Sequence, residues 1–230
     1  NYSAYSKGGR GTVYDNVRVM RRPNTRRLVA TNSDGIHMKN VGKGLKILNS
    51  SFETVMDDSI ALQTFNSLVV KVLSDNEIVI AKRSPKIPMH LEAGQTLSFY
   101  LRADLKYLGA AKVKESALYK EEGLAAKAKK IKKFCWNPKK FYRVLLDQSL
   151  ELAVGDVVID DVPAAYDFVI ENNFIYSGWA RGLLFTGTKG VVRGNTTDST
   201  GRINIGPQLL SWGIGSFAKD ILIENNRLVN

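Results

Sequence analysis

The chain is 230 residues long and carries 33 lysines and arginines against 22 aspartates and glutamates, for a formal net charge of +11. This length can bury a substantial core in one or two domains, and the lack of a long apolar run excludes a bilayer-spanning helix. One cysteine and two histidines cannot supply the four ligands of a usual structural zinc site. No cofactor or metal is therefore expected, although a calcium site made of oxygen ligands stays open.

Two acidic motifs follow one another early in the chain. Asn32-Ser33-Asp34-Gly35 precedes Asp57-Asp58, and 23 residues separate Asp34 from Asp57. If the chain winds as a solenoid with coils of about that length, residues one period apart stack on neighbouring coils roughly 5 Å apart. The spacing therefore predicts a patch that gathers three carboxylates. Their mutual repulsion favours a retained proton on at least one of them near neutral pH.

The middle of the chain, residues 65–164, is predicted to be a small basic β-rich module inserted into the solenoid. Leu91–Phe99 and Leu152–Ile159 each have the pattern of a glycine corner followed by an alternating strand. Glu115–Lys133 has a composition that allows a helix, which Gly123 weakens. The two ends of the module are expected to lie close together, because the coils resume after it.

Four segments share one pattern, a short aliphatic strand that runs into Asn, Ser or Gly. They are Leu45–Ser50, Phe168–Asn173, Gly190–Asn195 and Ile221–Asn226. Asn and Gly tolerate the left-handed backbone of sharp corners, and a stacked Asn can hydrogen-bond its equivalent on the next coil. Their recurrence predicts an all-β, right-handed parallel β-helix made of residues 1–64 and 165–230. A β-sandwich, whose strands recur every ~8 to 12 residues, is the alternative.

Further side chains are candidates for substrate binding near the aspartates. His37 alternates outward in an apolar strand and could tune a carboxylate or bind a sugar hydroxyl, although a plain surface histidine fits equally. Arg181 opens an apolar strand, where a guanidinium can grip an anionic or hydroxylated substrate. Trp179 and Trp212 are candidates for stacking on sugar rings, although large aromatic side chains more often belong to a core.

The order and spacing of these motifs resemble the polygalacturonase-like right-handed β-helix hydrolases, and more closely glycoside hydrolase family 110, the α-1,3-galactosidases. The matching segments are Asp34-Gly35-Ile36-His37, Asp57-Asp58, Gly155-Asp156, Asn172-Asn173, Arg181-Gly182-Leu183-Leu184 and, after Trp212, Asp220–Asn226. The resemblance implies an inverting exo-hydrolase that removes terminal α-galactose without a metal, with Asp34, Asp57 and Asp58 around the scissile bond. The chain departs from the family pattern at Ile203–Pro207 and Ser211–Gly215, which lack the expected acidic residues.

A glycoside hydrolase acting on a galactose-containing or acidic glycan is thus the leading hypothesis, since cleavage of a glycosidic bond needs a proton donor beside a carboxylate base. An inverting mechanism predicts carboxyl groups ~6.5–9.5 Å apart, and a retaining one about 5–5.5 Å. A non-catalytic carbohydrate-binding or adhesive β-helix, of the surface or tail-fibre type, is the alternative, because one fold serves both. A polysaccharide lyase or epimerase is a third interpretation, which Arg181 keeps open.

Basic residues gather in two clusters that bear on the partner. They are Arg10, Arg18, Arg21, Arg22, Arg26 and Arg27, and Lys127, Lys129, Lys130, Lys132, Lys133, Lys139 and Lys140. The clusters suit an anionic oligo- or polysaccharide or form a merely solvated face. No nucleic-acid-binding motif accompanies them, so nucleic acid is not the expected partner. A secreted or periplasmic bacterial protein is implied by the resemblance. A piece of a longer protein is expected from the polar start and uncapped end, and an oligomer is compatible with the sequence.

Overall fold

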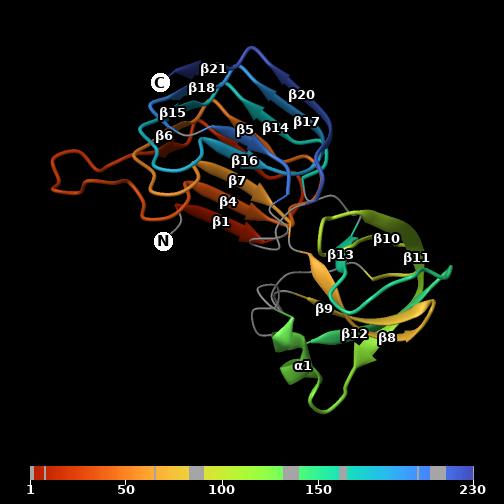
Figure 1. Cartoon of the computed structure of the whole chain (residues 1–230). Coiled ribbons are helices and arrows are strands. Elements are labelled where there is room, and N and C mark those ends of the chain that lie inside the picture. Colours follow the sequence, from red (N-terminus) through yellow and green to blue (C-terminus); the bar gives the residue numbers. More distant parts are fainter. Residues whose placement is uncertain are drawn as a thin grey trace. The chain divides into compact units, whose positions relative to one another are not determined.

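The structure, a computed structural model, describes residues 3–7, 9–64, 66–82, 91–131, 140–160, 165–200, 202–207 and 216–229 (Figure 1). These residues fall into two compact units. The solenoid unit contains the described residues of 1–64 and 165–229, and the barrel unit contains those of 66–160. No helix in these described ranges is long and apolar enough to span a membrane.

Three five-stranded parallel sheets make up the solenoid unit (Figure 1). The first sheet contains β1 (Ala4–Lys7), β4 (Ile36–Lys39), β7 (Ile60–Gln63), β16 (Leu183–Phe185) and β19 (Ile203–Ile205). The second contains β2 (Val13–Asp15), β5 (Lys46–Leu48), β14 (Val169–Glu171), β17 (Thr188–Arg193) and β20 (Lys219–Glu224). The third contains β3 (Arg18–Val19), β6 (Ser51–Glu53), β15 (Phe174–Tyr176), β18 (Thr196–Asp198) and β21 (Arg227–Val229). Each coil adds one strand to each sheet, which confirms the predicted parallel β-helix and excludes the β-sandwich.

The barrel unit enters the third coil between β7 and β14 without disturbing the register. Partners on either side of it are 123 residues apart in all three sheets: Ile60 with Leu183, Lys46 with Val169, and Ser51 with Phe174. The backbone N–H of Asn40 donates to the carbonyl of Gln63 at 2.9 Å, where the chain leaves the coil. The backbone N–H of Ala165 donates to the carbonyl of Val41 at 2.6 Å, where it returns. The chain therefore departs beside Asn40 and re-enters beside Val41, two consecutive residues of the second coil.

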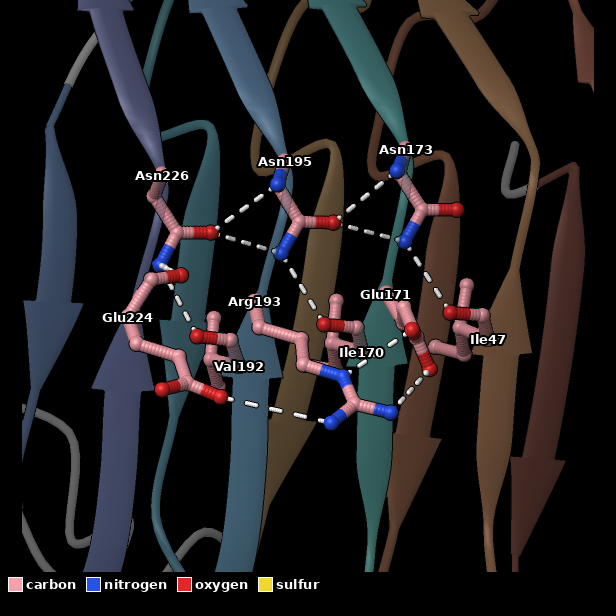
Figure 2. A network of polar contacts seen from close by, with 9 residues as sticks. All are labelled: Ile47, Ile170, Glu171, Asn173, Val192, Arg193, Asn195, Glu224 and Asn226. Carbon is pink, nitrogen blue, oxygen red and sulfur yellow. Dashed lines mark hydrogen bonds and ion pairs between the residues drawn. The ribbon is translucent and has the colours of Figure 1, made fainter.

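Asparagines build the corner between the second and third sheets. One residue per coil adopts the left-handed conformation there, with φ between 47° and 63°: Asn16, Asn49, Asn172, Gly194 and Asn225. The next position forms a ladder in which Nδ2 of Asn173 donates to Oδ1 of Asn195, and Nδ2 of Asn195 donates to Oδ1 of Asn226, both at 2.9 Å (Figure 2). The same two oxygens accept the backbone N–H groups of Asn173 and Asn195 at 3.0 Å. The stacking predicted from the four repeated segments is confirmed.

Inward-facing side chains of successive coils form a single apolar core. Ile36 of β4, Ile60 of β7 and Leu183 of β16 occupy one inward column and are fully buried. The rings of Phe168 and Phe185 pack in the same core with their centroids 5.8 Å apart. Burial of side chains of this size contributes roughly 1.5–3 kcal/mol each. Stacking provides this burial, which an isolated coil cannot achieve.

The barrel unit is a closed antiparallel barrel of six strands. Their order is β10 (Thr96–Tyr100), β11 (Tyr107–Tyr119), β12 (Phe141–Leu146), β9 (Glu77–Lys82), β8 (Ser67–Ser74) and β13 (Val157–Asp160). The predicted glycine corners are present, because Gly94 precedes β10 with φ 86° and Gly155 precedes β13 with φ 105°. The barrel-like insert expected from the sequence is therefore confirmed as a fold.

The helix predicted for Glu115–Lys133 is wrong over its first part. Residues up to Tyr119 belong to β11, where Ala117 pairs with Arg143 of β12. Within the described part of this segment only α1 (Leu124–Lys130) is helical, and Gly123 precedes it in the left-handed conformation with φ 75°. Cross-strand pairing thus overrides the helix propensity of the lysine- and alanine-rich segment, and the glycine marks the change of structure. Residues 132 and 133 lie outside the described ranges.

Candidate active site

Asp34, Asp58 and Arg181 occupy one register position on three successive coils. Ile36 pairs with Ile60, which in turn pairs with Leu183, and each of the three polar residues lies two positions earlier. The backbone N–H of Asp58 donates to Oδ1 of Asp34 at 3.2 Å. The coil is one residue longer than the sequence spacing suggested, so Asp58 stacks on Asp34, whereas Asp57 was the expected partner.

Gly35 allows this close stacking. A Cβ atom at this position would lie 2.5 Å from the backbone oxygen of Ser59 and 2.8 Å from the ring of Phe52. Gly35 is not among the described residues with positive φ. The glycine after Asp34 is thus explained by the close approach of two coils beside the carboxylates.

The three aspartates converge as predicted. One carboxylate oxygen from each of Asp34, Asp57 and Asp58 lies within 4.8 Å of the other two. Asp34 and Asp58 are buried, with 3% and 2% of their surface exposed, whereas Asp57 is exposed. Burial raises the pKa of Asp58 to about 6, although Arg181 opposes the rise. Partial desolvation, followed by the charge of Asp34, raises the pKa of Asp57. The cluster therefore holds carboxyl groups that keep protons to higher pH than ordinary aspartates.

Two further side chains predicted from the sequence contact these aspartates. Nε and Nη2 of Arg181 donate to the two carboxylate oxygens of Asp58 at 2.6 and 3.0 Å, which is a bidentate ion pair. Nδ1 of His37 contacts the carboxylate of Asp34. His37 is 6% exposed, so it is not a plain surface histidine, and its ring packs edge-on against Tyr5. Arg181 and His37 thus orient two of the three carboxylates.

The donor set also bears on metal binding. Three carboxylates this close could coordinate a hard cation such as Ca²⁺, which prefers oxygen ligands. Asp58 already accepts both hydrogen bonds from the Arg181 guanidinium, which offsets part of the negative charge. The Arg181 guanidinium therefore already balances one of the three carboxylates of the cluster.

Of the two tryptophans predicted to stack on sugars, the structure describes Trp179 and not Trp212. Trp179 is 75% exposed, at the corner that precedes β16, and its backbone N–H donates to the carbonyl of Val55 at 3.0 Å. It is therefore a surface side chain two residues before Arg181, and its sugar-stacking role stays a prediction. Trp212 lies outside the described residues.

A pocket in the segment that precedes Asp34 was not predicted from the sequence. It has a volume of about 350 Å³ and is lined by Ser3, Arg27, Leu28, Val29, Ala30, Thr31 and Asn32. Its wall comes from the long connection between β3 and β4, which projects from the coils (Figure 1). The arginines of this connection were recognised as a basic cluster, but composition alone could not indicate a concave surface.

Fold and site together define a parallel β-helix that carries a carboxylate cluster at one corner of its coils. No model of a known protein family matches the chain. The chain is similar to alpha-1,3-galactosidase B of Bacteroides thetaiotaomicron, with 27% identity over 233 residues. The similarity covers 97% of this chain and 34% of that protein, so the chain spans about a third of its relative's length. The relative is distant, and its name agrees with the resemblance seen in the order of the motifs.

Proposed function

We propose that the chain forms the catalytic part of a glycoside hydrolase that removes terminal α-linked galactose from a glycan. The observation that carries the proposal is the convergence of Asp34, Asp57 and Asp58 within 4.8 Å of one another. The distant similarity to an alpha-1,3-galactosidase supports the choice of sugar. Buried and like-charged carboxylates are costly for stability, and such a cost is typical of a working site.

Asp57 is the proposed general acid. It is the exposed member of the cluster, so a glycosidic oxygen can reach it, and its raised pKa keeps a proton available. In the reaction, its carboxyl group donates that proton to the glycosidic oxygen as the bond to the anomeric carbon breaks.

Asp34 and Asp58 are the proposed pair that binds and deprotonates the attacking water. A water that makes two hydrogen bonds of ~2.8 Å at a near-tetrahedral angle joins oxygens ~4.6 Å apart, and the aspartate oxygens lie within 4.8 Å. His37 and Arg181 hold these two carboxylates in place. The water oxygen bonds to the anomeric carbon, and this displacement inverts the configuration there. The proton of the water passes to one carboxylate.

Stereochemistry tests this proposal sharply because the carboxylates are close. Inverting enzymes usually place acid and base ~6.5–9.5 Å apart, and retaining enzymes about 5–5.5 Å. The observed limit of 4.8 Å between oxygens is shorter than both ranges. The proposal of a shared water predicts that β-galactose appears first in proton NMR spectra of a reaction with an α-1,3-galactoside. Initial release of α-galactose would contradict it.

Substitution identifies the residues responsible. We expect Asp57→Asn, Asp34→Asn and Asp58→Asn to lower turnover of the α-galactoside by about 10²-fold or more, the usual scale for loss of acid–base catalysis. Asp198→Asn is a matched control, because Asp198 lies on β18 and its carboxylate accepts a hydrogen bond from its neighbour Ser199. Full turnover by the Asp57 variant would exclude it as the acid.

One observation favours a second candidate, a non-catalytic carbohydrate-binding β-helix. Asp34 and Asp58 both have cationic or potentially cationic partners, as purely structural residues would. A binding module would retain affinity for α-galactosides and would release no galactose at any pH. The same purified chain therefore distinguishes the two candidates when binding and product release are measured side by side.

A further inference from the structure

The pocket lined by Ser3 and residues 27–32 belongs to the segment that leads to Asp34, since its last lining residue lies two positions before that aspartate. We propose that it is a subsite for an anionic substituent, a sulfate ester or a carboxylate, on the sugar that follows the cleaved galactose. The inference rests on the proposed function, because it assigns the neighbouring part of the same glycan. Its volume of about 350 Å³ lies within the ~300–1,000 Å³ usual for small-ligand pockets.

Backbone hydrogen bonds fix the pocket beside the catalytic corner. Thr31 pairs with Val55 of the following coil. The N–H of Ala30 donates to the carbonyl of Thr54, and the N–H of Met56 donates to that of Thr31, both at 3.1 Å. Thr31 precedes Asp34 by only three residues, so the pocket wall and the carboxylates belong to one continuous corner.

Another contact joins the pocket to the same corner from the first coil. The backbone N–H of Ser3, which lines the pocket, donates to the carbonyl of Asp34 at 3.4 Å. The lining residues Ser3 and Thr31 thus flank the aspartate in space and in sequence. The proposal therefore assigns this pocket to the sugar bonded to a galactose at the carboxylates.

The charge of the pocket favours an anion. Arg27 lines it, and among the described residues no ion pair involves Arg27. No aspartate or glutamate occurs between Asp15 and Asp34, whereas Arg21, Arg22 and Arg26 accompany Arg27. A guanidinium without a carboxylate partner in a concave wall is suited to bidentate recognition of a sulfate or carboxylate.

The opposite charges of the two neighbouring sites also orient the substrate. Asp34, Asp57 and Asp58 repel an anionic group, whereas Arg27 attracts one. The galactose to be removed is therefore uncharged, and the charged group belongs to the next sugar. A glycan with sulfate on its terminal galactose is predicted to bind worse than its neutral counterpart.

Binding measurements test the subsite independently of turnover. Titration calorimetry of the full chain carrying Asp57→Asn, which should not cleave the ligands, would compare a neutral α-galactosyl-galactose disaccharide with the same disaccharide sulfated on its reducing-side sugar, and with one that has a uronate there. We expect the two anionic disaccharides to bind about tenfold more tightly, the effect of one charge-assisted hydrogen bond. Arg27→Gln should abolish that preference, so that the neutral and the two anionic disaccharides bind with similar affinity.

Arg22→Gln is the matched control, because Arg22 belongs to the same exposed connection and does not line the pocket. This variant should retain the preference. Equal affinities for neutral and anionic disaccharides, or a preference that survives Arg27→Gln, would overturn the subsite even if galactose is released. Anion binding that depends on Arg27, without release of galactose, would support the subsite while the proposed hydrolase activity fails.

Discussion

Replacement of Asp58 with asparagine should change the pH dependence of stability in a defined direction. Asp58 is 2% exposed, and burial raises the pKa of its carboxyl group from the ordinary 3.8 to about 6. A raised pKa in the folded chain favours the protonated form. The contribution of the protonated Asp58 carboxyl group to the free energy of unfolding is therefore complete below pH 3.8 and is lost as the pH rises through 6. Such a rise in the pKa of Asp58 corresponds to a loss of about 3 kcal/mol in the free energy of unfolding.

The asparagine variant cannot undergo this loss because it does not ionise. At low pH we expect Asp58→Asn to be less stable than the unmodified chain by about 1 kcal/mol, since an amide matches the Arg181 fork less well than a carboxyl group. As the pH rises from 3.5 to 7.5, the difference should move in favour of the variant by about 3 kcal/mol. Above neutral pH the variant should therefore be the more stable protein.

Urea unfolding at four pH values between 3.5 and 7.5, followed by circular dichroism, measures this change. The slopes of unfolding free energy against urea must agree between the proteins, because the chain has two units. Asp104→Asn, at an exposed position before β11, provides a control for the loss of a carboxyl group elsewhere. A stability difference between the chain and its Asp58 variant that stays constant with pH would refute the reasoning.

Three further predictions concern the coils and their corner. Gly35→Ala should lower the free energy of unfolding by about 1–3 kcal/mol and reduce turnover, because the new Cβ meets the backbone oxygen of Ser59. Asn195→Ala should cost about 3 kcal/mol or more in urea unfolding, since it leaves the carbonyl of Ile170 and the N–H of Asn173 without their partner. Trp179→Ala should change stability by less than about 0.5 kcal/mol and raise KM for the glycan several-fold if its ring stacks on sugar; an unchanged KM would remove it from the site.

The parts of the fold that sequence reasoning predicted depend on a short repeated pattern. A strand followed by Asn recurs because each coil needs a left-handed corner and a stacked amide, so Asn173, Asn195 and Asn226 were visible without a structure. The first coil's equivalent, Val13–Asp15 followed by Asn16, was missed. Its interval to the next unit is lengthened by the connection between β3 and β4, which hides the period.

The parts of the site that could not be predicted depend on register and burial. A spacing of about one coil placed Asp34 near Asp57-Asp58, but a difference of one residue decides which aspartate is buried and which is exposed. His37 faces away from the coil core as expected, and its burial against Asp34 depends on packing that strand alternation does not encode. Arg181 is 123 residues from Asp58, so their ion pair requires knowledge that the inserted barrel preserves the register.

Two columns of charged side chains in the solenoid unit differ in the order of their charges. On the second sheet, Arg193 lies between Glu171 and Glu224, with nitrogen–oxygen distances of 2.9 and 4.0 Å, so opposite charges alternate along the coils (Figure 2). At the corner before the first sheet, Asp34 stacks directly on Asp58, and Arg181 follows only on the coil after Asp58.

The exposed column gains little from its charges, because surface ion pairs contribute at most about 1 kcal/mol. The buried column carries two like charges that a lysine or arginine at position 34 would relieve. Selection for stability alone would favour alternating opposite charges most strongly at buried positions, because burial strengthens the repulsion between like charges. The stacked aspartates place like charges next to each other at the position where burial makes their repulsion most destabilising. This is the pattern expected when an arrangement that lowers stability serves chemistry.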